Sequence, residues 1–338
     1  MPDSMTAGNM RSGILARMPG LAAAVLVGLL LAGCSVISLD LSPRIQPLEE
    51  ETVEGRGYAK ILLMELAGFL TDETPSGALS LGTPPQRVPL LVRVREELTK
   101  AAEDSNVRGL VIRINSPGGT VTASDIIFHE LRAFKSRRDI PVVAVMMDVA
   151  ASGGYYVGLA ADTIVAHPTT VTGSIGVIML TLNAEGLLDK VGLQAAAIKS
   201  GERKDMGSPF RALAPEERAI FQSVIDELQR QFVDKVVARR GLARDAALRA
   251  ADGRVYTAEQ ALGLRLIDRV GYVTDALDIA RQAMGVKDAR VIVYRRPRQY
   301  RATYYAQAES RAPGIDSAFA HLASLVGSGP RFLYLWSP

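Results

Sequence analysis

Cysteine and histidine are scarce in this chain, and their scarcity excludes several kinds of site. The 338 residues include one cysteine, Cys34, and three histidines, His129, His167 and His321. A single thiol can form neither an intramolecular disulfide nor a cysteine-rich metal centre. The histidines are too far apart in the sequence to share one helix face as metal ligands. We therefore expect no metal site.

A marked excess of one charge is also missing. The chain has 39 lysine and arginine residues against 36 aspartate and glutamate residues, a formal net charge of +3. This balance is too even for a nucleic-acid-binding surface, so we expect no nucleic-acid partner. Hydrophobic residues make up 48% of the chain and charged residues 22%, which is typical of a globular protein rather than a disordered one. The length fits one large α/β domain or two average domains.

The first 33 residues have the pattern of an export signal. Arg11 and Arg17 precede an uncharged, largely apolar run over residues 19–39, as in a signal peptide. The run contains Leu-Ala-Gly before Cys34, which resembles the lipobox of bacterial lipoproteins, where the cysteine is lipidated and becomes the first residue after cleavage. An uncleaved spanning helix is the alternative, because such a helix needs about 20 apolar residues. Both interpretations place the protein in the bacterial cell envelope, tethered to a membrane with its remaining chain on the periplasmic side.

The rest of the chain divides by composition. Residues 34–57 are polar and contain an acidic run, which is typical of a tether between a membrane and a folded domain. A domain of catalytic size is predicted over residues 58–290. Residues 291–338 contain the run R-R-P-R-Q-Y-R at positions 295–301, end in an apolar segment, and are predicted to form a C-terminal appendage.

Within the domain, apolar runs rich in branched residues alternate with segments of helical periodicity. This alternation indicates parallel strands joined by crossover helices, and therefore an α/β fold. The predicted strands are residues 59–66, 109–114, 142–147, 163–166, 171–180 and 194–198. The predicted helices are residues 93–103, 123–137, 152–161 and 215–239.

Glycine-rich turns follow the predicted strands at N-S-P-G-G (residues 115–119), A-S-G-G-Y-Y (151–156) and T-G-S-I-G-V (172–177). Glycines at such turns let the backbone approach a ligand closely with its N–H groups exposed. None of the turns fits the dinucleotide pattern G-x-G-x-x-G or the phosphate-loop pattern G-x-x-x-x-G-K-[ST]. A nucleotide-dependent enzyme is therefore disfavoured.

Ser152 lies at a predicted strand-to-helix turn, which can hold a nucleophilic hydroxyl beside free backbone N–H groups. An ordinary helix-capping serine is the alternative. A nucleophilic serine needs a base, and His167 precedes a proline in a predicted turn, with no carboxylate partner indicated. Lys199 and Lys204 flank a loop after a predicted strand, and a lysine becomes a base when dehydration lowers its pKa from about 10.4. The residues alone do not decide between the two lysines.

Five ordered motifs add a resemblance. The succession L-V-I-R-I-N-S-P-G-G, A-A-S-G-G-Y-Y-V, T-G-S-I-G-V, K-S-G-E-R-K-D-M-G-S-P-F and G-R-V-Y-T-A-E-Q-A is similar to the signal peptide peptidase A family, the bacterial protease IV type. The similarity covers residues 58–283. It implies Ser152 as nucleophile, Lys204 as general base, Ser174 as the residue that orients the lysine, and backbone N–H groups of Gly119 and Gly153 as oxyanion donors.

The resemblance also implies a fold and an activity. The fold would be a crotonase-like or Clp-protease-like spiral of β-β-α units. The activity would be that of a membrane-tethered serine endopeptidase, which uses a Ser-Lys dyad to cleave signal peptides or other apolar peptide segments and needs no cofactor. A homo-oligomer with sites at protomer boundaries is expected, so that Ser152 and Lys204 could meet between chains.

The sequence departs from the family at two points, and two other functions compete with the peptidase. Arg265 stands where the family usually has a small residue, and the lipobox stands where familiar members have a spanning helix. An acyl-CoA enzyme of the crotonase fold would be cytoplasmic and would lack a Ser-Lys pair. A catalytically silent, membrane-associated scaffold on the same fold is the other alternative, and the presence of both Ser152 and Lys204 argues against it.

Overall fold

A computed structural model describes residues 46–72, 88–297, 303–305 and 331–336. The expected export signal, Cys34 and His321 lie outside these residues. No helix in the described ranges is long and apolar enough to cross a membrane.

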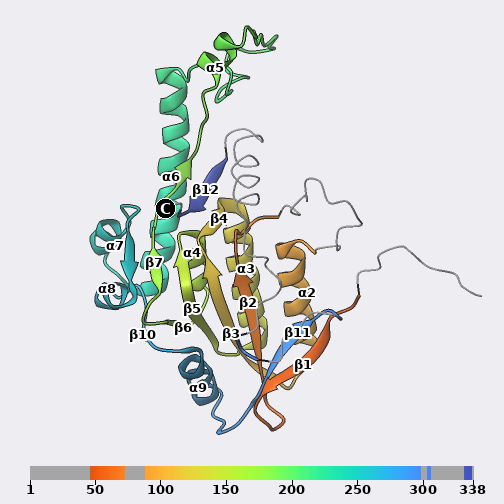
Figure 1. The fold of residues 1–338 in the computed structure, drawn as a ribbon. Coiled ribbons are helices and arrows are strands. Elements are labelled where there is room, and N and C mark those ends of the chain that lie inside the picture. Colours follow the sequence, from red (N-terminus) through yellow and green to blue (C-terminus); the bar gives the residue numbers. More distant parts are fainter. Residues whose placement is uncertain (1–45, 73–87, 298–302, 306–330, 337–338) are drawn as a thin grey trace, which may run out of the picture. The chain divides into compact units, whose positions relative to one another are not determined.

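The described part of the chain contains a nine-stranded sheet in which strands run in the order β1-β11-β2-β3-β5-β6-β10, with β7 paired to β5 and β9 paired to β7 (Figure 1). From β11 to β10 neighbouring strands are parallel, while β1 is antiparallel to β11 and β9 to β7. The strands are β1 (Glu49–Glu54), β2 (Lys60–Ala67), β3 (Val107–Ser116), β5 (Val142–Ala151), β6 (Thr163–Ala166), β7 (Val171–Gly173), β9 (Val255–Thr257), β10 (Arg269–Val270) and β11 (Arg290–Arg295).

Helices cover both faces of the central strands, and for this reason those strands are apolar on both faces. On one face, Leu62 of β2 and Ile112 of β3 belong to a core cluster with α2 (Leu90–Glu103) and α3 (Val121–Arg138). On the other face, alternate residues of the same strands form a second cluster with α9 (Val273–Ala283). The sheet is therefore the rigid layer from which the connecting loops project.

Helix α6 (Pro215–Arg240) extends beyond the sheet (Figure 1). It starts with Pro215 and two glutamates, and it ends at Gly241, which adopts the left-handed conformation at φ 60°. One face of its C-terminal half is buried and includes Phe232 and Val236. Helix α5 (Glu185–Lys190) lies beside the N-terminal end of α6 and contains no buried residue. The short helices α7 (Arg244–Ala250) and α8 (Ala258–Gly263) follow α6.

A second, antiparallel sheet contains three strands of the described chain in the order β4-β12-β8. They are β4 (Gly118–Thr120), β8 (Ile178–Met179) and β12 (Phe332–Leu335). The central strand, β12, comes from the segment that we expected to be an appendage.

The predicted α/β class is confirmed, and most predicted elements are present with shifted ends. The strand predicted over residues 171–180 is interrupted and forms β7 and β8. The strand predicted over residues 194–198 is wrong: this segment is exposed and has no regular structure. Its apolar residues find no neighbouring strand, and Ile198 is fully exposed.

The sheet also extends past the ends of the domain predicted over residues 58–290. Strand β1 lies within the expected tether, and β11 continues to Arg295. Lys60 at the start of β2 holds β1 through Glu50, at 2.7 Å between the amine and the carboxylate. Arg265, the residue that departs from the family pattern, has φ 60°. A glycine adopts this conformation without strain, whereas an arginine does so at some cost.

Candidate active site

The turn between β3 and β4 is built so closely that only glycine fits. The Ser116 hydroxyl donates to the Gly68 carbonyl at 2.6 Å and accepts from the Gly118 N–H at 3.1 Å. Gly118 has φ 107°. A Cβ on Gly119 would lie 2.0 Å from the carbonyl oxygen of Leu70. The chain therefore requires glycine at both positions of this turn.

Ser152 occupies a strained position between β5 and α4 (Gly153–Gly158). Its φ of 52° and ψ of −115° are rare for a residue with a side chain. Neighbouring bonds hold this conformation: the Ser152 N–H donates to the Gly173 carbonyl at 2.7 Å, and the Tyr156 N–H donates to the Ser152 carbonyl at 2.8 Å. A strained serine on a strand-to-helix turn is typical of a nucleophile presented at the edge of a sheet.

The Ser152 side chain has no structural role among the described residues. The residue is fully buried, at 0% exposure. Its hydroxyl has no hydrogen-bond partner in the described chain, and it does not cap α4. Buried hydroxyl groups are normally bonded. The capping alternative therefore fails, and an unpartnered buried hydroxyl on a strained turn is typical of a reactive group.

Gly153 and the β3–β4 turn lie against each other. A Cβ on Gly118 would lie 2.8 Å from the backbone nitrogen of Gly153. A Cβ on Gly153 would lie 2.4 Å from the Ser124 hydroxyl and 3.1 Å from the Gly118 Cα. The structure thus places Gly119 and Gly153, the two expected oxyanion donors, on adjacent turns beside Ser152.

Ser174 lies next to Ser152 at the edge of the sheet. Strand β7 is parallel to β5, and Ala151 pairs with Gly173. Ser152 and Ser174 directly follow the ends of these two paired strands. Ser174 has φ 47° and is nearly buried. Its N–H donates to the Arg254 carbonyl at 2.8 Å.

Lys204 lies in the loop over residues 199–211, which we call the Lys204 loop, and its side chain is exposed. Lys199 is engaged instead: its amine pairs with Asp205 at 2.8 Å. Arg211 bridges Asp205 and Glu217, at 2.8 Å and 2.6 Å. Hydrogen bonds from Arg211, and then from Lys199, lower the pKa of Asp205 below its ordinary value. The loop is thereby fixed to the first turn of α6.

A single chain does not bring Lys204 to Ser152. The Lys204 loop is bonded to α6 at Glu217, whereas the helix that follows Ser152 meets α6 at Phe232, with a distance of 5.0 Å between the Tyr156 and Phe232 ring centroids. These two points on α6 are 15 residues apart, or about 22 Å along the helix axis. In Figure 1, α5 lies beside the N-terminal end of α6, whereas α4 lies beside the sheet.

The two described histidines take no part in this site. His129 is exposed on α3. The Nδ1 of His167 lies 2.9 Å from the Thr169 hydroxyl, and its ring contacts the edge of Tyr272. Within the described ranges, no cluster of three or more histidine, cysteine, aspartate or glutamate residues could hold a metal ion.

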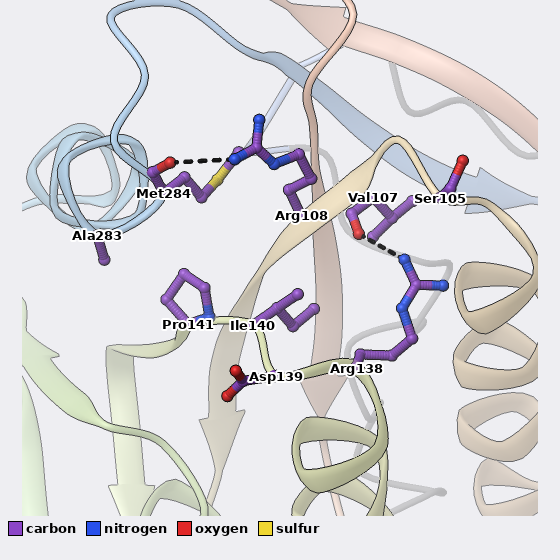
Figure 2. Close-up of a pocket in the computed structure, with 9 residues that line it drawn as sticks. All are labelled: Ser105, Val107, Arg108, Arg138, Asp139, Ile140, Pro141, Ala283 and Met284. Atoms are coloured by element: carbon purple, nitrogen blue, oxygen red, sulfur yellow. Dashed lines mark hydrogen bonds between the residues drawn. The ribbon is translucent and has the colours of Figure 1, made fainter.

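A polar pocket lies at the opposite end of the strands and has a structural role (Figure 2). It lies between the start of β3, the end of α3 and the end of α9. Arg138 donates to the Val107 carbonyl at 3.1 Å, and Arg108 donates to the Met284 carbonyl at 3.4 Å. Both guanidinium groups thus hold backbone carbonyls at this edge, whereas Ser152 follows the carboxyl end of β5.

Comparison with known proteins defines the class of this protein. A family model described as peptidase family S49 matches residues 134–287. The chain is 37% identical over 247 residues to a putative signal peptide peptidase SppA from Enterococcus faecium, covering 73% of this chain and 70% of that protein. It is 43% identical over 192 residues to the putative protease slr0021 of Synechocystis, covering 57% and 69%. The protein is therefore a serine peptidase.

The chain belongs to peptidase family S49, and the resemblance predicted from its motifs is confirmed. Among solved structures, it aligns with a mutant form of ClpP1 from Listeria monocytogenes at a TM-score of 0.41 and 16% identity, covering 64% of this chain and 94% of that one.

Sequence reasoning missed two features beside Ser152. The first is Ser116, whose hydroxyl shapes the glycine turn. The N-S-P-G-G motif contained this signal, because a serine two residues before a glycine can bond its N–H. The second is β12 in residues 332–335. The alternation of aromatic residues with leucine in F-L-Y-L-W was a strand signal, but no local feature indicated its partner strands.

Proposed function

We propose that this peptidase is a membrane-tethered endopeptidase in which Ser152 of one chain is activated by Lys204 of a neighbouring chain. The observation that carries the proposal is the fully buried, unpartnered hydroxyl of Ser152 on its strained turn. A serine hydroxyl needs an adjacent base to react. No histidine of the described chain supplies that base, and Lys204 of the same chain is held elsewhere.

The chemistry follows from these positions. The Lys204 amine accepts the Ser152 proton while the hydroxyl oxygen attacks the peptide carbonyl, and it then protonates the leaving amine. Water attacks the acyl-enzyme by the same route and releases the second product. Ser174 orients the amine, and the N–H groups of Gly119 and Gly153 stabilise the oxyanion. Such donors contribute about 3 to 4 kcal/mol each in other enzymes.

The surface around Lys204 supports a neighbouring chain. Large apolar side chains are exposed on α5 and its flanking segments. They are Leu182, Leu187, Val191, Leu193, Ile198 and Phe210. Several large apolar side chains exposed within one short segment are typical of an interaction site. A second copy that covers it would also remove water from Lys204, and an uncharged lysine amine requires such a setting.

Location and substrate follow from the sequence. Lipidation at Cys34, or an uncleaved apolar helix, would tether the chain on the periplasmic side of a bacterial membrane. Signal peptides and other apolar peptide segments are the proposed substrates, and the name of the Enterococcus faecium relative agrees with them. The proposed mechanism uses no cofactor.

Mixed assemblies test the dyad between chains. Ser152→Ala and Lys204→Ala chains should each be inactive as homo-oligomers. When both are co-expressed in equal amounts, about a quarter of the sites in a closed ring would combine an intact Ser152 with a neighbour's intact Lys204. If the two kinds of chain mix at random, hydrolysis of casein or of a signal peptide should therefore return to about a quarter of the wild-type rate.

The control combines Ser152→Ala with the Ser152→Ala/Lys204→Ala double variant, which has no intact serine and should stay inactive. Mixed assemblies that also stay inactive would contradict a dyad between chains. Wild-type assemblies that hydrolyse no peptide would favour the catalytically silent scaffold.

A further inference from the structure

Strand β5 changes its register against β3 just before Ser152. Up to Met146 its residues pair one for one with those of β3, and the last such pair is Ile114 with Met146. The next pair is Ser116 with Ala150. Strand β5 therefore contains two extra residues in this interval, which form a β-bulge. We call residues 147–149 the β5 bulge.

The β5 bulge is also the place where β5 changes its neighbour on the other side. Met146 is the last residue that pairs with β6, opposite Ala166, and Val149 is the first that pairs with β7, opposite Val171. Bulges bend a strand, re-aim the side chains that follow, and are common beside active sites. The bulge thus separates the part of β5 in the centre of the sheet from the part that leads to Ser152.

The bulge sets how far β5 reaches along the sheet. Without the two extra residues, Ser116 would pair with Asp148, and Ser152 would lie two residues, or about 7 Å, further along the strand axis. The close approach of Gly118 to Gly153, with 2.8 Å between a Cβ on Gly118 and the Gly153 nitrogen, depends on the register after the bulge. The bulge therefore brings the turn that carries Ser152 level with the glycine turn after β3.

The side chain of Asn115 bonds the bulge from the side of β3. Its Oδ1 accepts from the Val149 N–H at 3.1 Å. The backbone of Asn115 is held in the ladder opposite Ala67, and its carbonyl accepts from the Gly68 N–H at 3.0 Å. The side chain thus reaches β5 from a fixed position. A backbone N–H without a partner inside a protein is costly, so this bond favours the bulged form of β5.

Two buried threonines bond the same part of β5 from the side of β7. The Thr170 hydroxyl donates to the Met146 carbonyl at 3.0 Å and also to the Met147 carbonyl. The Thr172 hydroxyl donates to the Ala150 carbonyl at 2.6 Å. Thr170 is 1% exposed and Thr172 is fully buried. Side chains on both sides therefore bond backbone groups at the place where β5 leaves its regular ladder.

We propose that Asn115 is a positioning residue for Ser152: by accepting from the Val149 N–H, it holds the β5 bulge in the form that sets Ser152 level with the glycine turn. The inference rests on the proposed function, since it takes Ser152 as the nucleophile. Asn115 acts through the backbone of β5 and touches neither the substrate nor the reacting atoms. Its loss should therefore slow the chemical step without weakening peptide binding.

Two substitutions of similar size test the acceptor. Asn115→Leu removes it, and because a displacement of about 1 Å at a reacting group costs about 100-fold in rate, kcat should fall between about tenfold and 100-fold. KM for a short peptide should stay within a factor of about two. Asn115→Asp keeps an acceptor oxygen and should retain most of the wild-type kcat. An equal loss of kcat in both variants would overturn the proposal, since the acceptor would then not be the cause.

Asp162→Leu is the matched control, because it removes the same kind of bond from the opposite end of β5. The Asp162 Oδ2 accepts from the Val142 N–H at 3.0 Å, and the carboxylate also pairs with Lys135 at 2.8 Å. This variant should lose thermal stability and keep the wild-type kcat. A loss of kcat equal to that of Asn115→Leu would overturn the proposal, as would an unchanged kcat in Asn115→Leu with the fold intact by circular dichroism.

Amide hydrogen exchange of the assembled protein, read by mass spectrometry, separates this proposal from the proposed function. Residues 147–152 should exchange faster in Asn115→Leu than in the wild type. Unchanged exchange would contradict the hold of Asn115 on the bulge, and faster exchange with an unchanged kcat would contradict its effect on Ser152. A wild type that hydrolyses no peptide and takes no phosphonate would contradict the proposed function, while faster exchange in the variant would still uphold the hold of Asn115 on the bulge.

Discussion

Replacing Gly119 by alanine tests whether the glycine turn beside Ser152 is part of the catalytic machinery. The new Cβ would lie 2.0 Å from the Leu70 carbonyl oxygen and 2.6 Å from the Leu70 carbonyl carbon and backbone nitrogen. All three atoms are backbone, so no side-chain rotation can relieve the contact. The turn must move away from Leu70 or distort.

Two effects of different size should follow. Crowding of this kind destabilises a fold by about 1 to 3 kcal/mol. The N–H of Gly119 moves with the turn, and a displacement of about 1 Å at a reacting group costs about 100-fold in rate. We therefore expect a loss of about 100-fold in kcat/KM with the fold retained, measured with a peptide substrate beside thermal unfolding.

Gly263→Ala is the matched control, because a Cβ there meets nothing within 4 Å. This variant should leave kcat/KM unchanged. Its free energy of unfolding should differ from that of the wild type by no more than about 0.5 kcal/mol. A Gly119→Ala enzyme with kcat/KM within a factor of about three of the wild type would refute the assignment of this turn to the oxyanion site.

Three further predictions concern the Lys204 loop, Ser174 and the membrane tether. The pKa of Asp205 is lowered in the folded protein from its ordinary value of 3.8. The ion pairs of Asp205 therefore stabilise the loop at pH values above 3.8, and this stabilisation is lost as the pH falls below 3.8 and the carboxylate becomes protonated. Pepsin should therefore cut residues 199–211 faster as the pH falls through this range. At pH 7, trypsin should cut the loop faster in Asp205→Asn than in the wild type. Equal cleavage of the two proteins would contradict a stabilising role of the Asp205 ion pairs. Ser174→Ala should lower kcat with little change in KM, while Ser174→Thr restores part of the rate; a change in KM alone would argue against an orienting role. Cys34→Ser should release the protein from membranes in cell fractionation, and unchanged retention would support the uncleaved helix.

The central strands could be predicted because burial on both faces leaves a long apolar run in the sequence. Strands β2, β3, β5 and β6 are of this kind. Strand β1 could not, since Glu49, Glu50 and Glu51 look like a solvated tether. Two of these charges are compatible with a strand because Lys60 pairs with Glu50 and Arg295 pairs with Glu51. The error over residues 194–198 has the opposite cause: apolar composition predicted a strand, but the described residues supply no strand beside this segment.

The site was predictable where its geometry is local. Ser152 follows from a strand, a glycine-flanked turn and a helix, all contiguous in the sequence. The choice of Lys204 over Lys199 depended on the family resemblance and stays a prediction. The placement of β12 between β4 and β8 depends on contacts across the whole chain, and no local pattern could supply its register.

Reaction with a serine-directed phosphonate is the most direct test of the central claim, that Ser152 is a nucleophile activated by Lys204. The assembled wild-type protein should gain one adduct per chain, located on Ser152 by mass spectrometry, and Lys204→Ala should lose the reaction while remaining assembled. Equal labelling of the wild type and Lys204→Ala would contradict the assigned base, and labelling at another serine would contradict the assigned nucleophile.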